Sequence, residues 1–240
     1  MIFLCFAVKD REIFINHLYQ YLQNFGMQMW YDRRDIFLGD DRQYTNIELG
    51  ANNPSVKYAV VVYTDNFANG NICLNEFDIL VNRHEANEIH IFPVFYKTVP
   101  DKIDERFSIL KKLVYKCFYN DNDYFAIALH MLAKMTQDEL DNSYIQHKTI
   151  KDIITNYEDR TDMKYQFLLI YNNISATNYD MRLTALFYLY NYLTFNNTKN
   201  YMHFKTMHYI FYYHNRHKLV DEKRELQIME NIVVYEFSKK

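Results

Sequence analysis

Glycine and proline occur only in the first 100 residues of this 240-residue chain, and their distribution restricts what each part can form. The four glycines and three prolines occupy positions 26, 39, 50 and 70, and 54, 93 and 100. Tight turns between strands use these residues, whereas helix interiors avoid them. We therefore predict an α/β domain over residues 1–137 and an all-helical C-terminal domain over residues 138–240.

The front part alternates between short apolar runs and helical patterns. The run at residues 57–63 is the clearest strand, because an unbroken β-branched run suits a parallel sheet covered on both faces. This alternation predicts a five-stranded parallel, flavodoxin-like sheet flanked by helices, which binds ligands beyond the carboxyl ends of its strands. The expected strands cover residues 2–8, 27–31, 57–63, 90–95 and 113–118. The first expected helix is capped by Asp10 and runs to Phe25. Further helices are expected over residues 43–49, 74–81 and 104–112 and from residue 122 onward, and a polar loop is expected at residues 32–41.

The back part reads as three to five helices separated by asparagine-rich breaks at residues 172–178 and 196–200. Two apolar stripes follow the helical period. One consists of Leu226, Met229, Val233 and Phe237. The other consists of Met181, Ala185, Leu189 and Tyr192.

Charge and cysteine content exclude several classes of protein. The net charge of −3 leaves no basic field, so neither nucleic acid nor a membrane is an expected partner. No stretch reaches the roughly 18 apolar residues of a membrane span. The three cysteines are far apart and form no CxxC pair, which predicts neither a disulfide framework nor a zinc site. We expect a cytoplasmic protein whose first residues form a strand rather than a signal peptide.

Motifs for metal and nucleotide binding are also missing. His84 and His90 are six residues apart, whereas the metalloprotease motif places its two histidines four apart. Of the later histidines at positions 203, 208, 214 and 217, only His214 and His217 share a helical face, with no acidic residue between them. No GxGxxG or P-loop motif exists. We predict no metal site and no standard dinucleotide fingerprint.

Five segments of the front part match one family in order and spacing. They are FLCF at residues 3–6 followed by KDRE at 9–12, WYDRRDIFLG at 30–39, the serine and strand at 55–63, NICLNEF at 71–77, and FPVFY at 92–96. Over about 135 residues the chain thereby resembles the TIR (Toll/interleukin-1 receptor) domain family. The similarity is to the bacterial NAD-cleaving type found in anti-phage immune systems such as Thoeris. The chain departs from the family pattern at Phe6, where Tyr is common, and at Ile72, where Trp is usual.

The resemblance implies a function and a set of site residues. Glu76 matches the catalytic glutamate of a TIR enzyme that breaks the nicotinamide–ribose bond of NAD+, giving ADP-ribose or a cyclic ADP-ribose-like signal. NAD+ is then the substrate, and no metal or other cofactor is needed. The implied substrate-binding residues are Phe6, Ala7, Asp32, Asp35, Gly39 and Cys73.

The resemblance also implies partners. The loop at residues 32–41 is expected to mediate self-association, and a downstream effector that responds to the product is left open.

Other interpretations stay open beside this one. A non-enzymatic TIR adaptor that acts by homotypic assembly is the main alternative, although such a protein would be expected to lack the glutamate. A flavodoxin-like or deoxyribosyltransferase-like enzyme would share the order of strands but lack the loop that begins at Trp30. Asp32 could be a local cap and Cys73 a small buried residue, as such residues often are.

Overall fold

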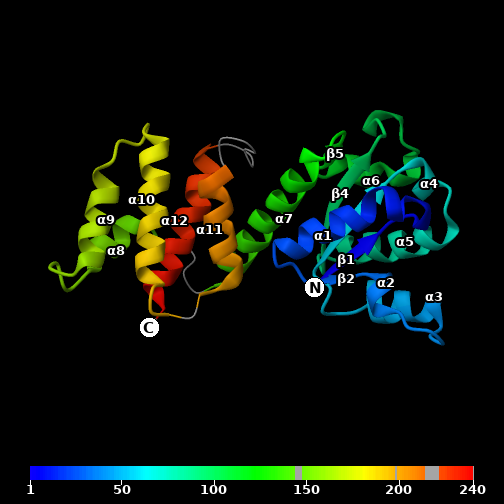
Figure 1. Ribbon diagram of the computed structural model, residues 1–240, viewed down its shortest axis with the longest axis horizontal. Coiled ribbons are helices and arrows are strands. Elements are labelled where there is room, and N and C mark those ends of the chain that lie inside the picture. The colour runs from blue at the N-terminus through cyan, green and yellow to red at the C-terminus, as the bar shows by residue number, and fades with distance from the viewer. Residues whose placement is uncertain (144–147, 198, 214–221, 240) are drawn as a thin grey trace. The chain divides into compact units, whose positions relative to one another are not determined.

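The computed structural model describes residues 1–143, 148–197, 199–213 and 222–239 (Figure 1). The chain forms two compact units, residues 1–128 and 129–240. The helix α7 (Asn122–Asp141) begins in the first unit and ends in the second. The boundary that we expected after residue 137 therefore lies within a continuous helix.

A five-stranded, fully parallel sheet forms the centre of the first unit and confirms the predicted fold class. Its strand order is β2-β1-β3-β4-β5, the flavodoxin-like order, with a switch of direction between β1 and β3. The strands are β1 (Ile2–Cys5), β2 (Met29–Trp30), β3 (Tyr58–Tyr63), β4 (His90–Tyr96) and β5 (Lys116–Phe118). β1, β2 and β5 are shorter than predicted. β1 ends at Cys5 because the chain soon turns into the short helix η1 (Val8–Asp10).

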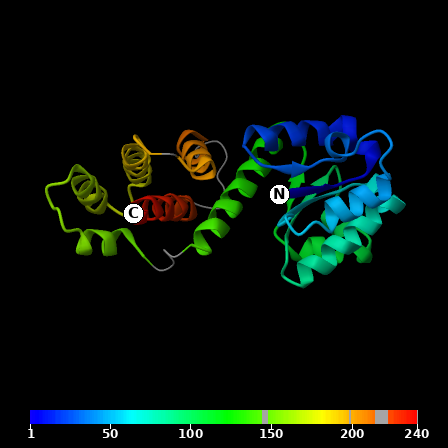
Figure 2. The same ribbon diagram turned by 90° about the horizontal axis from the view of Figure 1, so that it is seen from below.

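Helices cover both faces of this sheet, which explains the uninterrupted apolar run of β3. On one face lie the π-helical turn η2 (Arg11–Ile15), α1 (Asn16–Asn24) and the start of α7. Phe14 holds this layer together, since its ring centroid lies 4.5 Å from that of Tyr96 and 5.2 Å from that of Tyr124. Figure 2 shows α1 on one side of the strands and the cyan-to-green helices on the other.

The opposite face is packed by the second layer of helices. Here α5 (Asn71–Glu85), the π-helical segment η3 (Thr45–Ala51) and α6 (Ser108–Lys112) meet the sheet. Their core side chains include Phe77, Leu80 and Leu110, which pack with Val61 and Phe95 of the strands. Shorter elements join these layers: α2 (Asp32–Asp35), α3 (Arg42–Tyr44), α4 (Asp65–Ala68), η4 (Pro100–Lys102) and η5 (Glu105–Phe107).

The described part of the second unit is entirely helical, as predicted. After the end of α7 come α8 (Ile150–Asn156), α9 (Met163–Asn173), α10 (Tyr179–Leu193), α11 (Tyr201–Tyr213) and α12 (Glu222–Ser238). α10 packs against α9, α11 and α12 (Figure 1). None of the helices described in either unit has the length and apolar character needed to cross a bilayer.

One of the two predicted apolar stripes is correct. In α12, Leu226, Met229 and Val233 are buried, as expected, and Phe237 is half-buried. In α10 the predicted stripe is wrong, because Met181 and Tyr192 are 55% and 43% exposed. The buried face of α10 instead carries Leu183, Leu186, Leu189, Tyr190 and Leu193. α10 carries its own apolar side chains on all sides, so the period of the sequence alone did not identify the face that packs.

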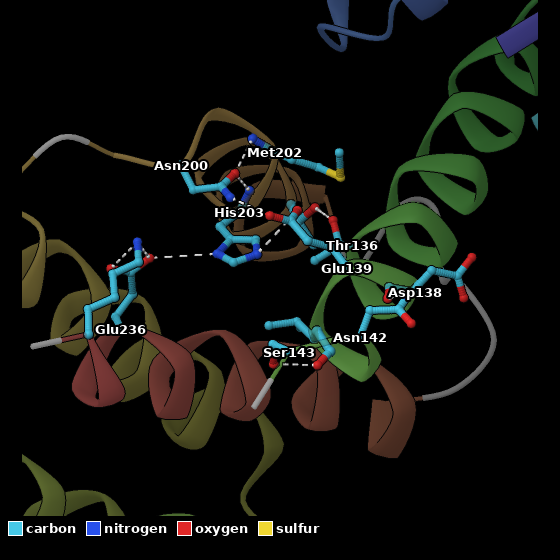
Figure 3. A network of polar contacts seen from close by, with 12 residues as sticks. Thr136, Asp138, Glu139, Asn142, Ser143, Asn200, Met202, His203 and Glu236 are labelled. Carbon is cyan, nitrogen blue, oxygen red and sulfur yellow. Dashed lines mark hydrogen bonds and ion pairs between the residues drawn. The ribbon is translucent and has the colours of Figure 1, made fainter. Parts of the chain in front are cut away.

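A buried polar network joins three helices of the second unit (Figure 3). His203 of α11 is fully buried, and its two ring nitrogens lie 3.6 Å from carboxylate oxygens of Glu139 in α7 and Glu236 in α12. The hydroxyls of Thr136 and Thr206 are 2.7 Å apart. His203 thus has two carboxylates as neighbours. His214 and His217 lie outside the described residues.

Candidate functional site

A cavity of about 590 Å³ opens beyond the carboxyl ends of β1 and β3. Its volume is in the range of small-molecule sites. This is the switch point of the strand order, where the fold predicts a ligand. Its lining comes from four stretches of the chain: Leu4, Phe6, Ala7, Val8 and Lys9; Asp32, Arg42, Gln43, Asn46 and Ile47; Asp65, Asn66, Asn69 and Gly70; and Cys73, Asn75 and Glu76.

Glu76 is the buried carboxyl group of this cavity. It lies in the second turn of α5 and is only 5% exposed. Burial, aided by the negative charge of Asp32, raises the pKa of Glu76 to about 8, although neighbouring Cys5 and Asn46 favour its charged form. A perturbed carboxyl inside a cleft is a recognised mark of a functional site. Without a cationic ligand, Glu76 is therefore mainly protonated at neutral pH.

The Glu76 carboxyl has a fixed polar neighbour on the adjacent segment η3. The side-chain amide of Asn46 donates a hydrogen bond to Oε1 of Glu76. The indole nitrogen of Trp30, at the end of β2, donates in turn to Oδ1 of Asn46 at 3.1 Å. Three elements therefore combine to hold one carboxyl group.

Two thiols lie beside Glu76, and both are held in their neutral form. The Cys73 thiol donates to the Gly70 carbonyl at 3.1 Å, and burial together with the charge of Glu76 raises its pKa to about 11. Burial also raises the pKa of Cys5 well above its usual value. The Cys5 thiol can donate one hydrogen bond, and its acceptor is either the Cys73 carbonyl, 3.7 Å away, or the Glu76 carboxyl. Since the thiolate is the nucleophilic form, neither cysteine is suited to attack a substrate.

Asp32 is anchored by an arginine that the sequence did not reveal as part of the site. Arg11 makes two parallel hydrogen bonds of 2.6 Å to the two carboxylate oxygens of Asp32. The guanidinium of Arg11 also lies over the rings of Phe6 and Tyr31, at 5.1 Å and 5.4 Å from their centroids. Arg42 lies 3.5 Å from the same carboxylate. Asp32 is thus part of a charged cluster at the rim rather than a local cap.

Asp10 supports another part of the rim and does not act as the predicted helix cap. Its side chain caps no backbone group of the following helix. The buried carboxylate instead accepts hydrogen bonds of 2.6 Å from the Thr64 hydroxyl and 2.6 Å from the Asn66 amide. Asn66 lines the cavity. The prediction failed because the partners of Asp10 follow β3, more than 50 residues away, and this long-range contact displaced the local one.

The structure brings together five of the seven predicted site residues. Phe6, Ala7, Asp32, Cys73 and Glu76 all line the cavity. The other two lie elsewhere, and their assignment stays a prediction. Asp35 accepts a hydrogen bond of 2.8 Å from the backbone of Tyr31 and pairs with Arg34, and Gly39 lies in the exposed loop with a φ of +98°.

Several lining residues were not predicted from the sequence, and Asn46 is the most informative of them. Its contacts with Trp30 and Glu76 span 16 and 30 residues. It lies in the stretch where a helix was expected over residues 43–49, but no local pattern marks an asparagine there as part of a site. Lys9 and Arg42 add positive charge to the lining.

Known proteins resemble this chain mainly in its first unit. The family model described as the TIR domain matches residues 1–157. The NAD(+) hydrolase TcpA of a Theionarchaea archaeon is 29% identical over 109 residues, which are 45% of this chain and 32% of that protein. The NAD(+) hydrolase TcpC of Escherichia coli is 31% identical over 96 residues, which are 39% of this chain and 30% of that protein.

A third relative is named for a different product. The 2' cyclic ADP-D-ribose synthase AbTIR of Acinetobacter baumannii is 29% identical over 133 residues, which are 55% of this chain and 47% of that protein. The chain spans less than half the length of each of these three curated relatives.

Proposed function

Because this chain belongs to the TIR domain family, we propose that its first unit binds NAD+ in the cavity and cleaves the nicotinamide–ribose bond. One observation carries the proposal: Glu76, the glutamate that matches the family pattern, is a buried carboxyl group in the wall of a ligand-sized cavity. The names of the relatives, which are NAD+ hydrolases and a cyclic ADP-ribose synthase, support the same reaction.

The burial of Glu76 suits the charge that this reaction develops. When nicotinamide leaves with the bonding electron pair, the ribose carbon becomes oxocarbenium-like, as in glycoside hydrolysis. A carboxylate in a low-dielectric site stabilises such a cation far better than one in water. Water then adds to that carbon and loses a proton, giving ADP-ribose, or a hydroxyl of the substrate takes its place, giving a cyclic product.

The elevated pKa of Glu76 couples its ionisation to the substrate. Without substrate, Glu76 holds its proton up to a pH of about 8. The nicotinamide ring of NAD+ is positively charged, and a nearby positive charge favours the carboxylate. Substrate binding is therefore expected to release the proton and to generate the catalytic anion where it is used.

The rest of the lining supports a nucleotide ligand. Lys9 and Arg42 can meet the negative pyrophosphate, and the side-chain amides of Asn66 and Asn69 offer donors and acceptors. Arg11 covers one face of the Phe6 ring, so a base could stack only on its other face. We assign the reaction to these residues without a metal.

The setting of the activity forms part of the proposal. We propose a cytoplasmic enzyme of anti-phage defence that assembles through the loop at residues 32–41. Phe37 is 73% exposed at the tip of this loop and Leu38 is fully exposed, and an exposed apolar pair favours contact with another protein.

The test is a nicotinamide-release assay of the full chain with NAD+, at low and high protein concentration. We expect Glu76→Gln, which keeps the shape of the side chain, to lower the rate by roughly 100-fold or more, as the loss of a main electrostatic group does. Glu85→Gln is the matched control, because Glu85 is exposed on the same helix, α5. Wild-type turnover in the Glu76→Gln variant would contradict the assignment. No nicotinamide release by the wild-type chain at any concentration, with self-association intact, would favour the adaptor instead.

A further inference from the structure

The side-chain amide of Asn46 has a defined orientation. Its Oδ1 accepts a hydrogen bond from Nε1 of Trp30. An indole nitrogen can only donate a hydrogen bond, so the oxygen of the amide must face the tryptophan. The amide nitrogen must then face Glu76, to which it donates. The hydrogen-bond chain settles an orientation that the shape of the amide alone leaves open.

The position of Trp30 depends on a close approach to η3. A Cβ atom at Gly50 would lie 2.7 Å from the indole nitrogen of Trp30 and 2.7 Å from a ring carbon of Phe3. Only glycine therefore lets the indole pack directly on the backbone of the segment that carries Asn46. The half-buried Trp30 is held between β1 and η3, and this fixes the direction of its N–H group.

The orientation of Asn46 matters to the chemistry of Glu76. A donor at Oε1 favours the charged carboxylate, whereas an amide turned round would present its oxygen and favour the protonated acid. Burial and Asp32 both oppose the charged form. The Asn46 amide and the Cys5 thiol are the side-chain hydrogen bonds that favour it, and Cys5 has a competing acceptor in the Cys73 carbonyl.

We propose that Asn46 is a positioning residue for Glu76, and that the indole N–H of Trp30 keeps its donor pointed at the carboxyl group. Asn46 holds Oε1 in place and leaves Oε2 for the substrate. The inference rests on the proposed function, because it assumes that the Glu76 carboxylate acts on the substrate. It adds two residues, Asn46 and Trp30, to the groups on which the reaction depends.

The test uses full-length chains with Asn46→Ala, Asn46→Asp and Trp30→Phe. Asn46→Asp is nearly isosteric and replaces the donor with a second carboxyl group, so it keeps the test valid if another variant folds poorly. Asn52→Ala is the control, because Asn52 is exposed directly after η3 and its side-chain amide donates to the carboxylate of Glu48. The first readout is the titration midpoint of the Glu76 carboxyl carbon by NMR, assigned with Glu76→Gln. The second is the pH profile of nicotinamide release.

We expect all three variants to move the Glu76 midpoint to higher pH, with Asn46→Asp moving it most. Activity at pH 7 should fall at least tenfold, through kcat more than KM, and should recover towards pH 9. Asn52→Ala should match the wild type. Unchanged midpoints in Asn46→Asp and Asn46→Ala would overturn the inference, and so would a loss of activity that is equal at every pH. If the wild-type chain releases no nicotinamide, the proposed function fails, but the NMR midpoints still decide the role of Asn46.

Discussion

The ionisation of Glu76 depends on side chains from three other segments of the chain. Burial within the cavity is the largest influence, and Asp32 adds a repulsive negative charge, while Cys5 and Asn46 partly offset both. Each of these neighbours is more than 25 residues away in sequence. A single glutamate on a helix has thereby become a group whose protonation changes near physiological pH.

The same property predicts how stability depends on pH. The pKa of Glu76 rises from 4.5 to about 8 on folding, so between these values the folded chain holds a proton that the unfolded chain has released. The free energy of unfolding should therefore fall as pH rises from 4.5 to 8, by at most about 1.4 kcal/mol per pH unit from this group. The stabilising contribution is complete below pH 4.5 and lost above pH 8.

Urea unfolding of the wild type and Glu76→Gln at pH 5, 6, 7 and 8 measures this effect. Glutamine cannot ionise, so the variant should lose less stability across the series and should be the more stable protein at pH 8. Glu85→Gln serves again as the control and should run parallel to the wild type. Parallel curves for Glu76→Gln and the wild type would show that Glu76 is not buried in the uncharged form.

Among the elements of the helical unit, α9 and α10 carry two buried tyrosines with opposite surroundings. The Tyr171 hydroxyl donates to Glu230 and accepts a hydrogen bond of 2.5 Å from Arg182. The Tyr190 hydroxyl is fully buried and has no hydrogen-bonding partner among the residues that the structure describes. A buried hydroxyl without a hydrogen bond lowers the stability of the fold, whereas a hydrogen-bonded one raises it.

Removing the two hydroxyls should consequently change stability in opposite directions. Tyr171→Phe is expected to lower the free energy of unfolding by about 1–2 kcal/mol, because it leaves charged partners with one bond fewer. Tyr190→Phe should be neutral or stabilising by about 1 kcal/mol. Each variant is the control for the other, since both remove one oxygen from a buried ring. Urea unfolding of the full chain at constant pH provides the measurement, and equal losses in both would refute the contrast.

At the scale of the whole molecule, the chain pairs a TIR unit with a helical unit through a helix that belongs to both. The core of the first unit closes around its own sheet, and the described helices of the second pack around α10. Exposed apolar residues remain on the first unit, and two of them, Phe37 and Leu38, are adjacent in the loop at residues 32–41. This loop borders the cavity through Asp32. Contact between copies of the chain at the loop could thus affect the site directly.

Specific activity should therefore increase with protein concentration, and Leu38→Asp should weaken that increase. Leu38 is fully exposed, so a charge there should not affect folding of the monomer. Val114→Asp is the control, because Val114 is 93% exposed in the segment before β5 and lies outside the loop. Nicotinamide release and sedimentation should be measured over the same range of concentration. Specific activity that is independent of concentration in all three proteins would rule out activation through the loop.

The sequence by itself determined the parallel sheet, the helical second unit and the location of the cavity. Apolar runs, helical periods and the placement of glycine and proline are local properties, and each can be read within a short window. The strand at residues 57–63 illustrates this, since its unbroken apolar run already required cover on both faces. The family pattern likewise placed Glu76, because its spacing from Cys73 is local.

Only the tertiary structure decided which polar side chains meet in the site. Arg11 pairs with Asp32 across 21 residues, Asn46 with Glu76 across 30, and Asp10 with Asn66 across 56. Such contacts form where separate connections converge at one edge of the sheet. No local pattern encodes which member of one loop will face which member of another. α10 carries apolar residues on all sides. For the same reason, the neighbouring helices, rather than the sequence of α10 itself, decided which of its faces packs.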